Sequence, residues 1–384
     1  MRLKRTILFL TLFLSFTGMY AQENLKMIVG TYTDGTSKGI YSFNFNQQTG
    51  TATPLCSLQI TNPSYLTIAK DGNHIYAVTE RNDDMASVCA IGFNKRTGSM
   101  QLINMQKTCG EDPCYVDTNG RMVITANYSG GSMSVFPLNA EGALQPMSQQ
   151  ISGGIGGPDT VRQTVPHVHC ARFSADGKDI YATDFSADRL LQIEVNADKT
   201  DIGNDWVFAN VTQGSGPRHI ELSRDGRFMY VMSELSGHIT VFALKGNNNK
   251  PLQEIQSDTT FARGGADIHL SPDGRFLYSS NRLKNDGIAI FRRNQTTGML
   301  TKIGYQPTGI HPRHFNITPN GRFLLCACRD DNTIQVFRIN SSTGLLTDTG
   351  QNIRVDKPAC VQFYPIVMLT DMPGNGTFKV IEKK

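Results

Sequence analysis

The chain has little excess of positive or negative charge. Its 384 residues include 37 Lys and Arg against 33 Asp and Glu, which leaves a formal net charge of +4. No run of basic residues is interleaved with aromatic ones, so we expect no nucleic-acid partner. Apolar residues at helical spacing are also missing, which excludes a mainly helical fold.

Recognisable metal and nucleophile motifs are absent as well. None of the eight cysteines shows the paired spacing of a zinc ribbon, and no Gly-x-Ser-x-Gly sequence marks a serine nucleophile. We expect most cysteines to be small buried residues, although Cys109 and Cys114, in CGEDPC, could form a disulfide across a loop. His167 and His169, in PHVH, would share one face of a strand, but no carboxylate is spaced to complete a metal site. We therefore predict neither a metal nor another cofactor.

A long apolar run stands at the N-terminus. The basic segment MRLKR precedes 14 largely apolar residues, Thr6–Met19, and cleavage is favourable after Ala21. This order predicts a signal peptide over residues 1–21, since the run is too short to span a bilayer comfortably. We expect the mature chain, residues 22–384, to be exported to the periplasm. After cleavage it would have no stable membrane span. Met19 is bulkier than the residue usual three positions before cleavage, so an uncleaved anchor is the alternative.

An internal repeat organises the rest of the chain. Alternating apolar and polar residues flank an Asp-Gly or Asn-Gly turn, a pattern typical of β-hairpins. The turn glycines are spaced by 47 to 57 residues, at Gly72, Gly120, Gly177, Gly226, Gly274 and Gly321. A second strand-and-turn motif occurs seven times, first at 39–50 and last at 332–344.

A repeat of this length with four short strands has the size of a propeller blade. We predict an all-β fold: one seven-bladed β-propeller with four-stranded antiparallel blades. The segments 357–369 and 26–32 would complete one blade, so the N- and C-terminal strands would pair and close the ring. The Gly-rich insertion at 151–168 is expected to form a loop on one face.

Polar residues recur where the first strand of each repeat begins. Arg218 lies eight residues before Gly226 and Glu234 eight after it, so an antiparallel register predicts that they are neighbours at one mouth of the channel. The same count from the other turn glycines gives Ser64, Asp112, His169, Ala266 and Arg313. Six of the eight histidines also fall in these first strands, namely His167, His169, His219, His269, His311 and His314. A plainer alternative is that these groups form ordinary ion pairs and buried packing.

Four segments together resemble the lactonase propeller family, which includes propeller-type 6-phosphogluconolactonases and fungal carboxy-muconate cyclases. They are PHVH (166–169), GPRHIELSRDGRFMYVMSE (216–234), SPDGRFLYSSNR (271–282) and HPRHFNITPNGRFLL (311–325). The similarity covers roughly residues 25–370. It implies a seven-bladed fold and a metal-independent site with His, Arg and Glu at one channel mouth.

On this resemblance, His169, Arg218 and Glu234 are the candidate catalytic residues, with Arg282 and His167 as binding residues. His219, next to Arg218 in the same first strand, and Arg313, at the start of another first strand, complete the binding set at the same mouth. His169 would act as the general base on water, and Arg218 would stabilise the oxyanion. Glu234 would orient Arg218 or serve as an alternative acid or base.

Three arginines in one site imply a small anionic substrate, such as a sugar lactone or a phosphorylated aldonolactone. The leading hypothesis is therefore a lactone hydrolase, a carboxylic ester hydrolase of the 6-phosphogluconolactonase type. Export would separate the protein from cytosolic phosphosugars, which weakens the case for a phosphorylated substrate. Two alternatives stay open: a cycloisomerase of the muconate-lactonising type, and a non-catalytic exported propeller used as a binding scaffold.

Overall fold

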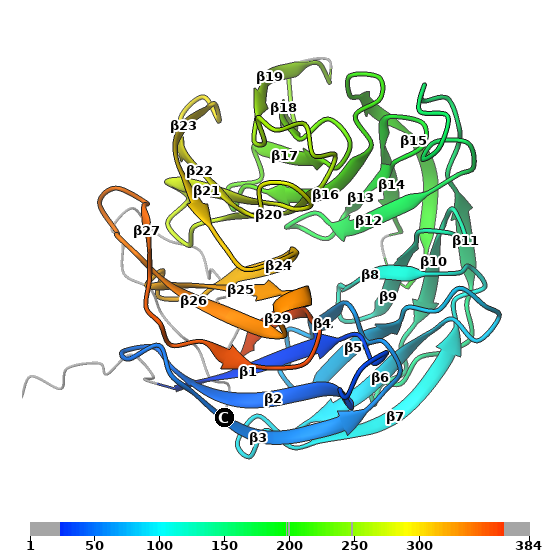
Figure 1. Cartoon of the computed structure of the whole chain (residues 1–384). Coiled ribbons are helices and arrows are strands. Elements are labelled where there is room, and N and C mark those ends of the chain that lie inside the picture. Colours follow the sequence, from blue (N-terminus) through cyan, green and yellow to red (C-terminus); the bar gives the residue numbers. More distant parts are fainter. Residues whose placement is uncertain (1–23, 197, 199, 247–248, 365–384) are drawn as a thin grey trace, which may run out of the picture.

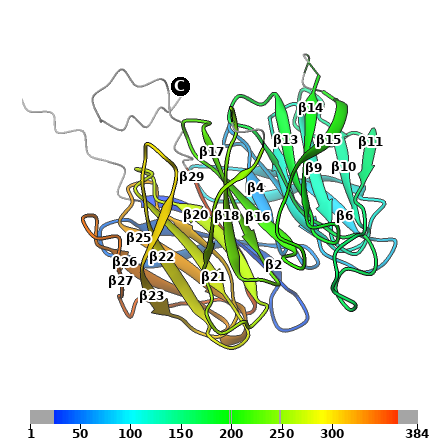
Figure 2. The same cartoon turned by 90° about the horizontal axis from the view of Figure 1, so that it is seen from above.

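The computed structural model describes residues 24–364, except 197, 199, 247 and 248. Seven antiparallel sheets are arranged in a ring, which confirms the predicted seven-bladed propeller (Figure 1). The described residues contain strands, loops and one 3-10 turn, η1 (Arg329–Asp331), and Figure 2 shows the same arrangement turned by 90°.

Each blade is given from its inner strand, at the channel, to its outer strand. The first blade is β29 (Pro358–Tyr364), β1 (Asn24–Thr31), β2 (Gly39–Asn46) and β3 (Ala52–Gln59). The second is β4 (Leu66–Ile68), β5 (His74–Thr79), β6 (Ser87–Phe93) and β7 (Met100–Lys107). The third is β8 (Pro113–Thr118), β9 (Met122–Asn127), β10 (Ser132–Pro137) and β11 (Gln149–Ser152). The fourth is β12 (Val168–Phe173), β13 (Asp179–Asp184), β14 (Arg189–Val195) and β15 (Ile202–Asn210).

The remaining three blades follow the same order. The fifth is β16 (Pro217–Leu222), β17 (Phe228–Ser233), β18 (His238–Ala243) and β19 (Pro251–Gln256). The sixth is β20 (Gly265–Leu270), β21 (Phe276–Asn281), β22 (Gly287–Arg293) and β23 (Leu300–Pro307). The seventh is β24 (Pro312–Ile317), β25 (Phe323–Cys328) and β26 (Thr333–Ile339), whose outer partner is split into β27 (Leu346–Asp348) and β28 (Ile353–Arg354).

The ring is closed by strands from the two ends of the described chain. β1 pairs antiparallel with β29, with Met27 opposite Phe363 and Val29 opposite Val361. The blue strand β1 and the red strand β29 lie side by side in Figure 1. Closure gives both strands a partner on each side, which removes the free edges that an open array would have. The predicted pairing of the N- and C-terminal segments is confirmed.

The turn glycines are required by backbone geometry. Gly226 has a φ of +64°, and the other five turn glycines also have positive φ. A side chain is disfavoured in this region of backbone conformation, so glycine is the residue that makes these tight hairpins possible. The turns recur because each blade must reverse its inner strand into its second strand within the thickness of the ring.

Tyrosines on the second strands tie neighbouring blades together. The hydroxyl of Tyr230 donates to the carbonyl of Gly298 in the next blade at 2.9 Å. Tyr76 and Tyr278 make the equivalent bonds, each to a glycine of the following blade. A buried tyrosine needs such a partner for its hydroxyl. Each of these hydrogen bonds therefore joins one blade to the next.

The structure bears on the expected disulfide, whereas the expected signal peptide lies outside the residues it describes. All eight cysteines are free, and Cys109 is exposed while Cys114 is buried, so the possible disulfide between them is wrong. The predicted signal peptide, residues 1–21, lies outside the described residues. Among the residues that are described, no helix has the length and apolar character needed to cross a membrane.

Candidate active site at one mouth of the channel

The central channel has two mouths of different construction. At the loop-side mouth the inner strands begin, and the connections between blades converge there. At the turn-side mouth lie the hairpin turns that carry the turn glycines. The labels of the inner strands surround the middle of the ring in Figure 1, from β4 through β8, β12, β16, β20 and β24 to β29. Each candidate side chain can therefore be assigned to one mouth by its position along an inner strand.

A β-bulge near the start of the inner strand redirects three predicted site residues. In the fifth blade Pro217 pairs with Ser233 and His219 with Met232, which leaves Arg218 as the extra residue. His169 and Arg313 are the extra residues of the fourth and seventh blades. A bulge removes its extra residue from the ladder and re-aims the side chain. Arg218 therefore meets Glu234 through a bulge, whereas the sequence predicted a plain cross-strand pair.

Counting back from the turn glycine fails in the third blade. Thr118 pairs with Val123 across a turn two residues shorter than that of the fifth blade. The extra residue is consequently Cys114, not Asp112. Asp112 lies at the edge of the loop-side mouth, where it accepts a hydrogen bond from Asn82 at 2.6 Å.

Glu234 is the centre of an arginine cluster. Its Oε2 accepts a hydrogen bond from Nε of Arg218 at 2.9 Å and lies 3.2 Å from Nη2 of Arg282. Its Oε1 accepts from Nη2 of Arg162 at 2.8 Å. Burial alone would raise the pKa of Glu234, but the three arginines outweigh burial and lower it to about 2. Glu234 is therefore a fixed anion that orients arginines, and it is a poor proton donor near neutral pH.

The arginines around Glu234 carry more positive charge than one carboxylate can balance. Arg218 is 1% exposed, and its Nη1 donates to the carbonyl of Ala266 at 2.8 Å. Arg282 donates to the carbonyls of Gly264 and Gly265. Burial and the neighbouring Arg218 lower the pKa of Arg282 to about 9. Burial is the larger cause and the neighbouring cations add to it, so an additional anion would stabilise the cluster.

Arg162 was not among the predicted site residues. It lies in the Gly-rich insertion, which forms a loop at the loop-side mouth as expected. Besides Glu234, its Nη2 contacts the hydroxyl of Tyr128 at 2.8 Å, and its guanidinium lies 5.3 Å from the ring of Phe185. The side chain is 36% exposed, more than those of Arg218 and Arg282. Arg162 is thus the cation of this cluster that a ligand from solvent would meet first.

Arg313 belongs to a second, separate acid centre. Its Nη2 lies 3.3 Å from Oε2 of Glu80, and its guanidinium lies 5.1 Å from the ring centre of Tyr32. The hydroxyl of Tyr32 donates to Glu80 at 2.8 Å, and the hydroxyl of Ser64 also donates to it. The predicted residues therefore share two carboxylates, Glu234 and Glu80, and the charge of Arg313 also acts on His169 and Arg282.

The two histidines of PHVH differ in environment. His169 is 5% exposed, its Nδ1 lies 3.7 Å from Sγ of Cys114, and its ring centre lies 5.2 Å from that of His219. Burial, Arg218 and other nearby cations hold the pKa of His169 well below its usual value, so the ring is neutral. His167 is half-buried and stacks on Tyr128 at 4.1 Å, and its Nδ1 donates to the carbonyl of Tyr128 at 2.8 Å.

The expectation that six histidines gather at one mouth is wrong for His269. This residue lines the turn-side mouth, because it is two positions further along β20 than the residues that face the site. His311 lies beside Arg282, with Nε2 3.4 Å from its Nη1. His314 points into the middle of the channel, towards Asp267.

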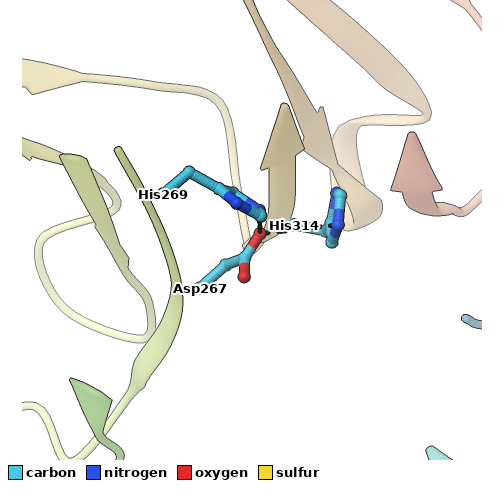
Figure 3. A group of neighbouring side chains, drawn as sticks. All are labelled: Asp267, His269 and His314. Carbon is cyan, nitrogen blue, oxygen red and sulfur yellow. Dashed lines mark hydrogen bonds and ion pairs between the residues drawn. The ribbon is translucent and has the colours of Figure 1, made fainter. Parts of the chain in front are cut away.

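Asp267 and the two histidines near it have the composition of a metal site. Figure 3 shows His269 and His314 around the carboxylate of Asp267, with Nε2 of His269 at 3.0 Å and Nε2 of His314 at 3.6 Å from Oδ2. The backbone N–H of Val361 donates to Nδ1 of His314 at 3.3 Å. A neutral imidazole that accepts at Nδ1 carries its proton on Nε2. Nε2 of His314 then has no free lone pair for a metal ion, so this residue does not fit as a ligand.

The turn-side mouth holds a cavity of about 420 Å³ that is lined by charged residues of both signs. Arg172 donates to Glu221 at 2.6 Å, and Glu221 also accepts from the backbone N–H of Leu270. Asp117 accepts from the backbone N–H groups of Phe173 and Thr118. Lys70 and Arg224 also line this cavity, whereas the residues that carry the family resemblance, His169, Arg218 and Glu234, lie at the loop-side mouth. We therefore assign the chemistry to the loop-side mouth.

The fold and site define the class: a seven-bladed propeller whose loop-side mouth brings arginines and neutral histidines together. The chain belongs to the lactonase family of seven-bladed β-propellers, whose family model matches residues 26–363. It is 34% identical to a 6-phosphogluconolactonase of Formosa agariphila over 88% of this chain and 99% of the relative. It is likewise 34% identical to a 6-phosphogluconolactonase of Bacillus subtilis, over 87% of this chain and 97% of the relative.

Solved structures agree with this membership. The periplasmic gluconolactonase of Pseudomonas aeruginosa is 31% identical, with a TM-score of 0.82 over 88% of this chain and 99% of that one. A Bacteroides uniformis protein, provisionally named a 6-phosphogluconolactonase, is 55% identical, with a TM-score of 0.87 over 89% of this chain and all of that one. The similarity in each case extends over the whole ring.

Three residues of the site were missed or undervalued from the sequence, for different reasons. Glu80 occupies the same repeat position as Glu234, eight residues after its turn glycine, so the repeat count contained the signal. Asp267 lies 48 residues after His219 and 47 before His314, which would reveal it in a count one position further along the strand. Arg162 lies in an insertion that no other repeat has, so no periodic signal could find it.

Proposed function

We propose that the protein hydrolyses a sugar lactone that carries, or develops, negative charge, and that the reaction takes place at the loop-side mouth. The observation that carries this proposal is the excess of cations around Glu234, where Arg162, Arg218 and Arg282 share one carboxylate. Membership of the lactonase family and the names of the relatives support the reaction class.

The chemistry needs a base and an oxyanion partner. A neutral His169 takes a proton from water, the water oxygen attacks the lactone carbonyl carbon, and the carbonyl oxygen becomes an oxyanion near Arg218. Collapse breaks the bond between this carbon and the ring oxygen, which takes the proton back from His169. The product is the open-chain aldonic acid, which releases its carboxyl proton to solvent and becomes the aldonate. A general base at this step contributes about 10²–10⁴-fold.

The low pKa of His169 fits a base that is switched on by its substrate. Burial and the surrounding arginines keep this imidazole neutral in the free protein. An anionic substrate would neutralise part of that positive field and so raise the basicity of His169 when it is needed. Arg282 and Arg313 provide the charges that hold the anionic group, and His167 and His219 line the path to it.

The test compares the purified mature chain with His169→Ala. Hydrolysis of gluconolactone and of 6-phosphogluconolactone is measured for both proteins in a pH-stat. We expect His169→Ala to lose about 10²–10⁴-fold in kcat. Turnover equal to that of the unchanged chain would contradict the assignment of the base. Turnover absent from every chain with either lactone would instead favour the cycloisomerase or the binding scaffold.

We also propose that the protein is exported to the periplasm after cleavage near Ala21. The basic segment and apolar run at the N-terminus support this, and one solved relative is named a periplasmic gluconolactonase. The substrate would then be an unphosphorylated sugar lactone. N-terminal sequencing of the protein from cells is the test, since a mature chain that still begins at Met1 would contradict export by cleavage.

A further inference from the structure

We propose that Asp267, in the middle of the channel, is a positioning residue for the loop-side site: it fixes the imidazole of His219, which in turn fixes the guanidinium of Arg218. The catalytic part of this inference rests on the proposed lactonase function. Asp267 lies on β20 of the sixth blade, beside Ala266, and both fall within the bulge between Gly265 and Ile268. Its carboxylate bonds to His219, which contacts Arg218, whereas the direct bond from Arg218 to this blade goes to the carbonyl of Ala266.

The first link joins Asp267 to His219. Nδ1 of His219 lies 2.8 Å from Oδ1 of Asp267, and the two side chains are 5% and 2% exposed. An ionised carboxylate has no hydrogen to donate, so Nδ1 of His219 must carry the proton of this bond. The bond therefore selects the tautomer of His219 in which Nε2 has a free lone pair.

The second link joins His219 to Arg218. Nη1 of Arg218 lies 3.3 Å from Nε2 of His219. A guanidinium only donates, so this contact requires the lone pair that the first link leaves on Nε2. Burial and Arg218 lower the pKa of His219 to about 3, so the ring stays neutral and Nε2 remains an acceptor. The two links are consistent with one tautomer only.

Packing keeps the ring of His219 in place. Its centre lies 5.4 Å from the ring centre of Tyr115, 5.9 Å from that of Tyr65 and 5.2 Å from that of His169, each edge-to-face. These neighbours limit the rotation of the imidazole but do not choose its tautomer. That choice depends on the carboxylate.

Asp267 is itself held firmly. Its Oδ2 accepts from Nε2 of His269 at 3.0 Å and from the backbone N–H of Phe315 at 3.1 Å, and Nε2 of His314 is 3.6 Å away (Figure 3). Burial opposes ionisation, but His269 and His314 outweigh it and hold the pKa of Asp267 well below its usual range. The carboxylate is thus a permanent acceptor between the two mouths of the channel.

Loss of this carboxylate would free the tautomer of His219. With a proton on Nε2, the imidazole would present N–H to the N–H of Arg218, and the guanidinium would move away from its place beside the reacting carbonyl. A shift of about 1 Å in a catalytic group can cost about 10²-fold in rate. The bond from Arg218 to Glu234 would survive, so binding of the substrate's charge would change much less.

The test compares Asp267→Asn with Asp117→Asn in the full mature chain. Asp267 is buried and Asp117 is half-buried in the same channel, but Asp117 accepts from backbone N–H groups and Asp267 bonds to His219. We expect Asp267→Asn to lower kcat by about 10²-fold with KM changed less than about threefold. Asp117→Asn should keep kcat. The double variant Asp267→Asn with His219→Asn should be no slower than His219→Asn alone, because Asp267 acts through His219.

A readout that needs no turnover separates this inference from the proposed function. In ¹⁵N-histidine NMR spectra of the unchanged chain, His219 should show a protonated Nδ1 and an unprotonated Nε2, and Asp267→Asn should alter this signal. The reverse tautomer in the unchanged chain would overturn the inference, even if Asp267→Asn fails to fold. Multiplied losses in the double variant would also overturn it.

Metal analysis decides the rival explanation. One equivalent of bound metal in the purified chain, lost together with activity in chelator or in Asp267→Asn, would make Asp267 a metal ligand and overturn the positioning role. We expect activity to survive chelation. We also expect His269→Gln and His314→Gln to retain the His219 tautomer, since His219 bonds to Oδ1 of Asp267 and these two histidines face Oδ2.

Discussion

The two mouths of the channel are lined by the same seven strands, yet their charged side chains are paired differently. At the turn-side mouth Arg172 and Glu221 form a close pair, and Asp117 is satisfied by backbone N–H groups. At the loop-side mouth Arg162, Arg218 and Arg282 share the single carboxylate of Glu234. A pair of opposite charges links neighbouring strands, whereas a group of cations that outnumbers its carboxylate attracts an anionic ligand.

The β-bulges explain how one repeat supports both roles. Beyond the bulge, towards the turns, the inner strands keep a regular ladder and their side chains pack like those of any blade. At the bulge, the extra residue is free of the ladder and can differ from blade to blade without disturbing the fold. Cys114, His169, Arg218 and Arg313 occupy this position in different blades. Function is concentrated where the repeat is allowed to vary.

The comparison predicts its largest effect for Arg218→Met. Removal of the guanidinium that faces the developing oxyanion should lower kcat/KM by about 10²–10³-fold. Initial-rate kinetics on gluconolactone, with circular dichroism to verify the fold, provide the measurement. A loss of less than about threefold would place the oxyanion elsewhere.

Glu234→Gln should show how strongly the loop-side cations need an anion. Three arginines would lose their carboxylate, so we expect the free energy of unfolding to fall by about 3–5 kcal/mol. Because the native pKa of Glu234 is lowered to about 2, its contribution is present above the unfolded pKa and is lost as pH falls from about 5 towards 2.

Urea unfolding of both chains between pH 7 and pH 2 measures this contribution. The difference between the unchanged chain and Glu234→Gln should shrink as the pH falls. Added gluconate or phosphate should raise the Tm of Glu234→Gln more than that of the unchanged chain. A difference that is constant with pH would contradict the account of Glu234 as a fixed anion.

Arg162→Ala should have a smaller effect, confined to binding. Its side chain is the most exposed of the partners of Glu234, so we expect KM to rise about tenfold while kcat changes little. Arg263→Ala is the matched control, since Arg263 lies at the same mouth but pairs with Asp159. Equal effects of the two substitutions would mean that only general surface charge matters.

The smallest catalytic effect is expected at the other mouth. Arg172→Met should leave kcat/KM within about threefold, although Glu221 loses its partner and stability falls by about 3–5 kcal/mol. The measurement is the same kinetic assay, made well below the Tm of the variant. A catalytic loss as large as that of Arg218→Met would remove the distinction between the two mouths.

Periodicity made the fold predictable, because seven copies of one pattern leave few other ways to bury the strands. It also predicted that Arg218 and Glu234 meet, although the register it assumed ignores the bulge. The same count misplaced the third blade, where a shorter turn puts Cys114 where Asp112 was expected. Arg162 comes from an unrepeated loop, and the role of Asp267 depends on side-chain orientation within the channel. The spacing of a repeat predicts neither the presence of Arg162 at the site nor the orientation of the Asp267 side chain.

The central claim is that an anionic ligand binds at the loop-side mouth, and a crystal structure of the protein soaked with gluconate tests it most directly. The account predicts that the carboxylate lies within hydrogen-bond distance of Arg218 or Arg282, with the sugar near His169. Gluconate bound only in the turn-side cavity, beside Arg172, would contradict the account.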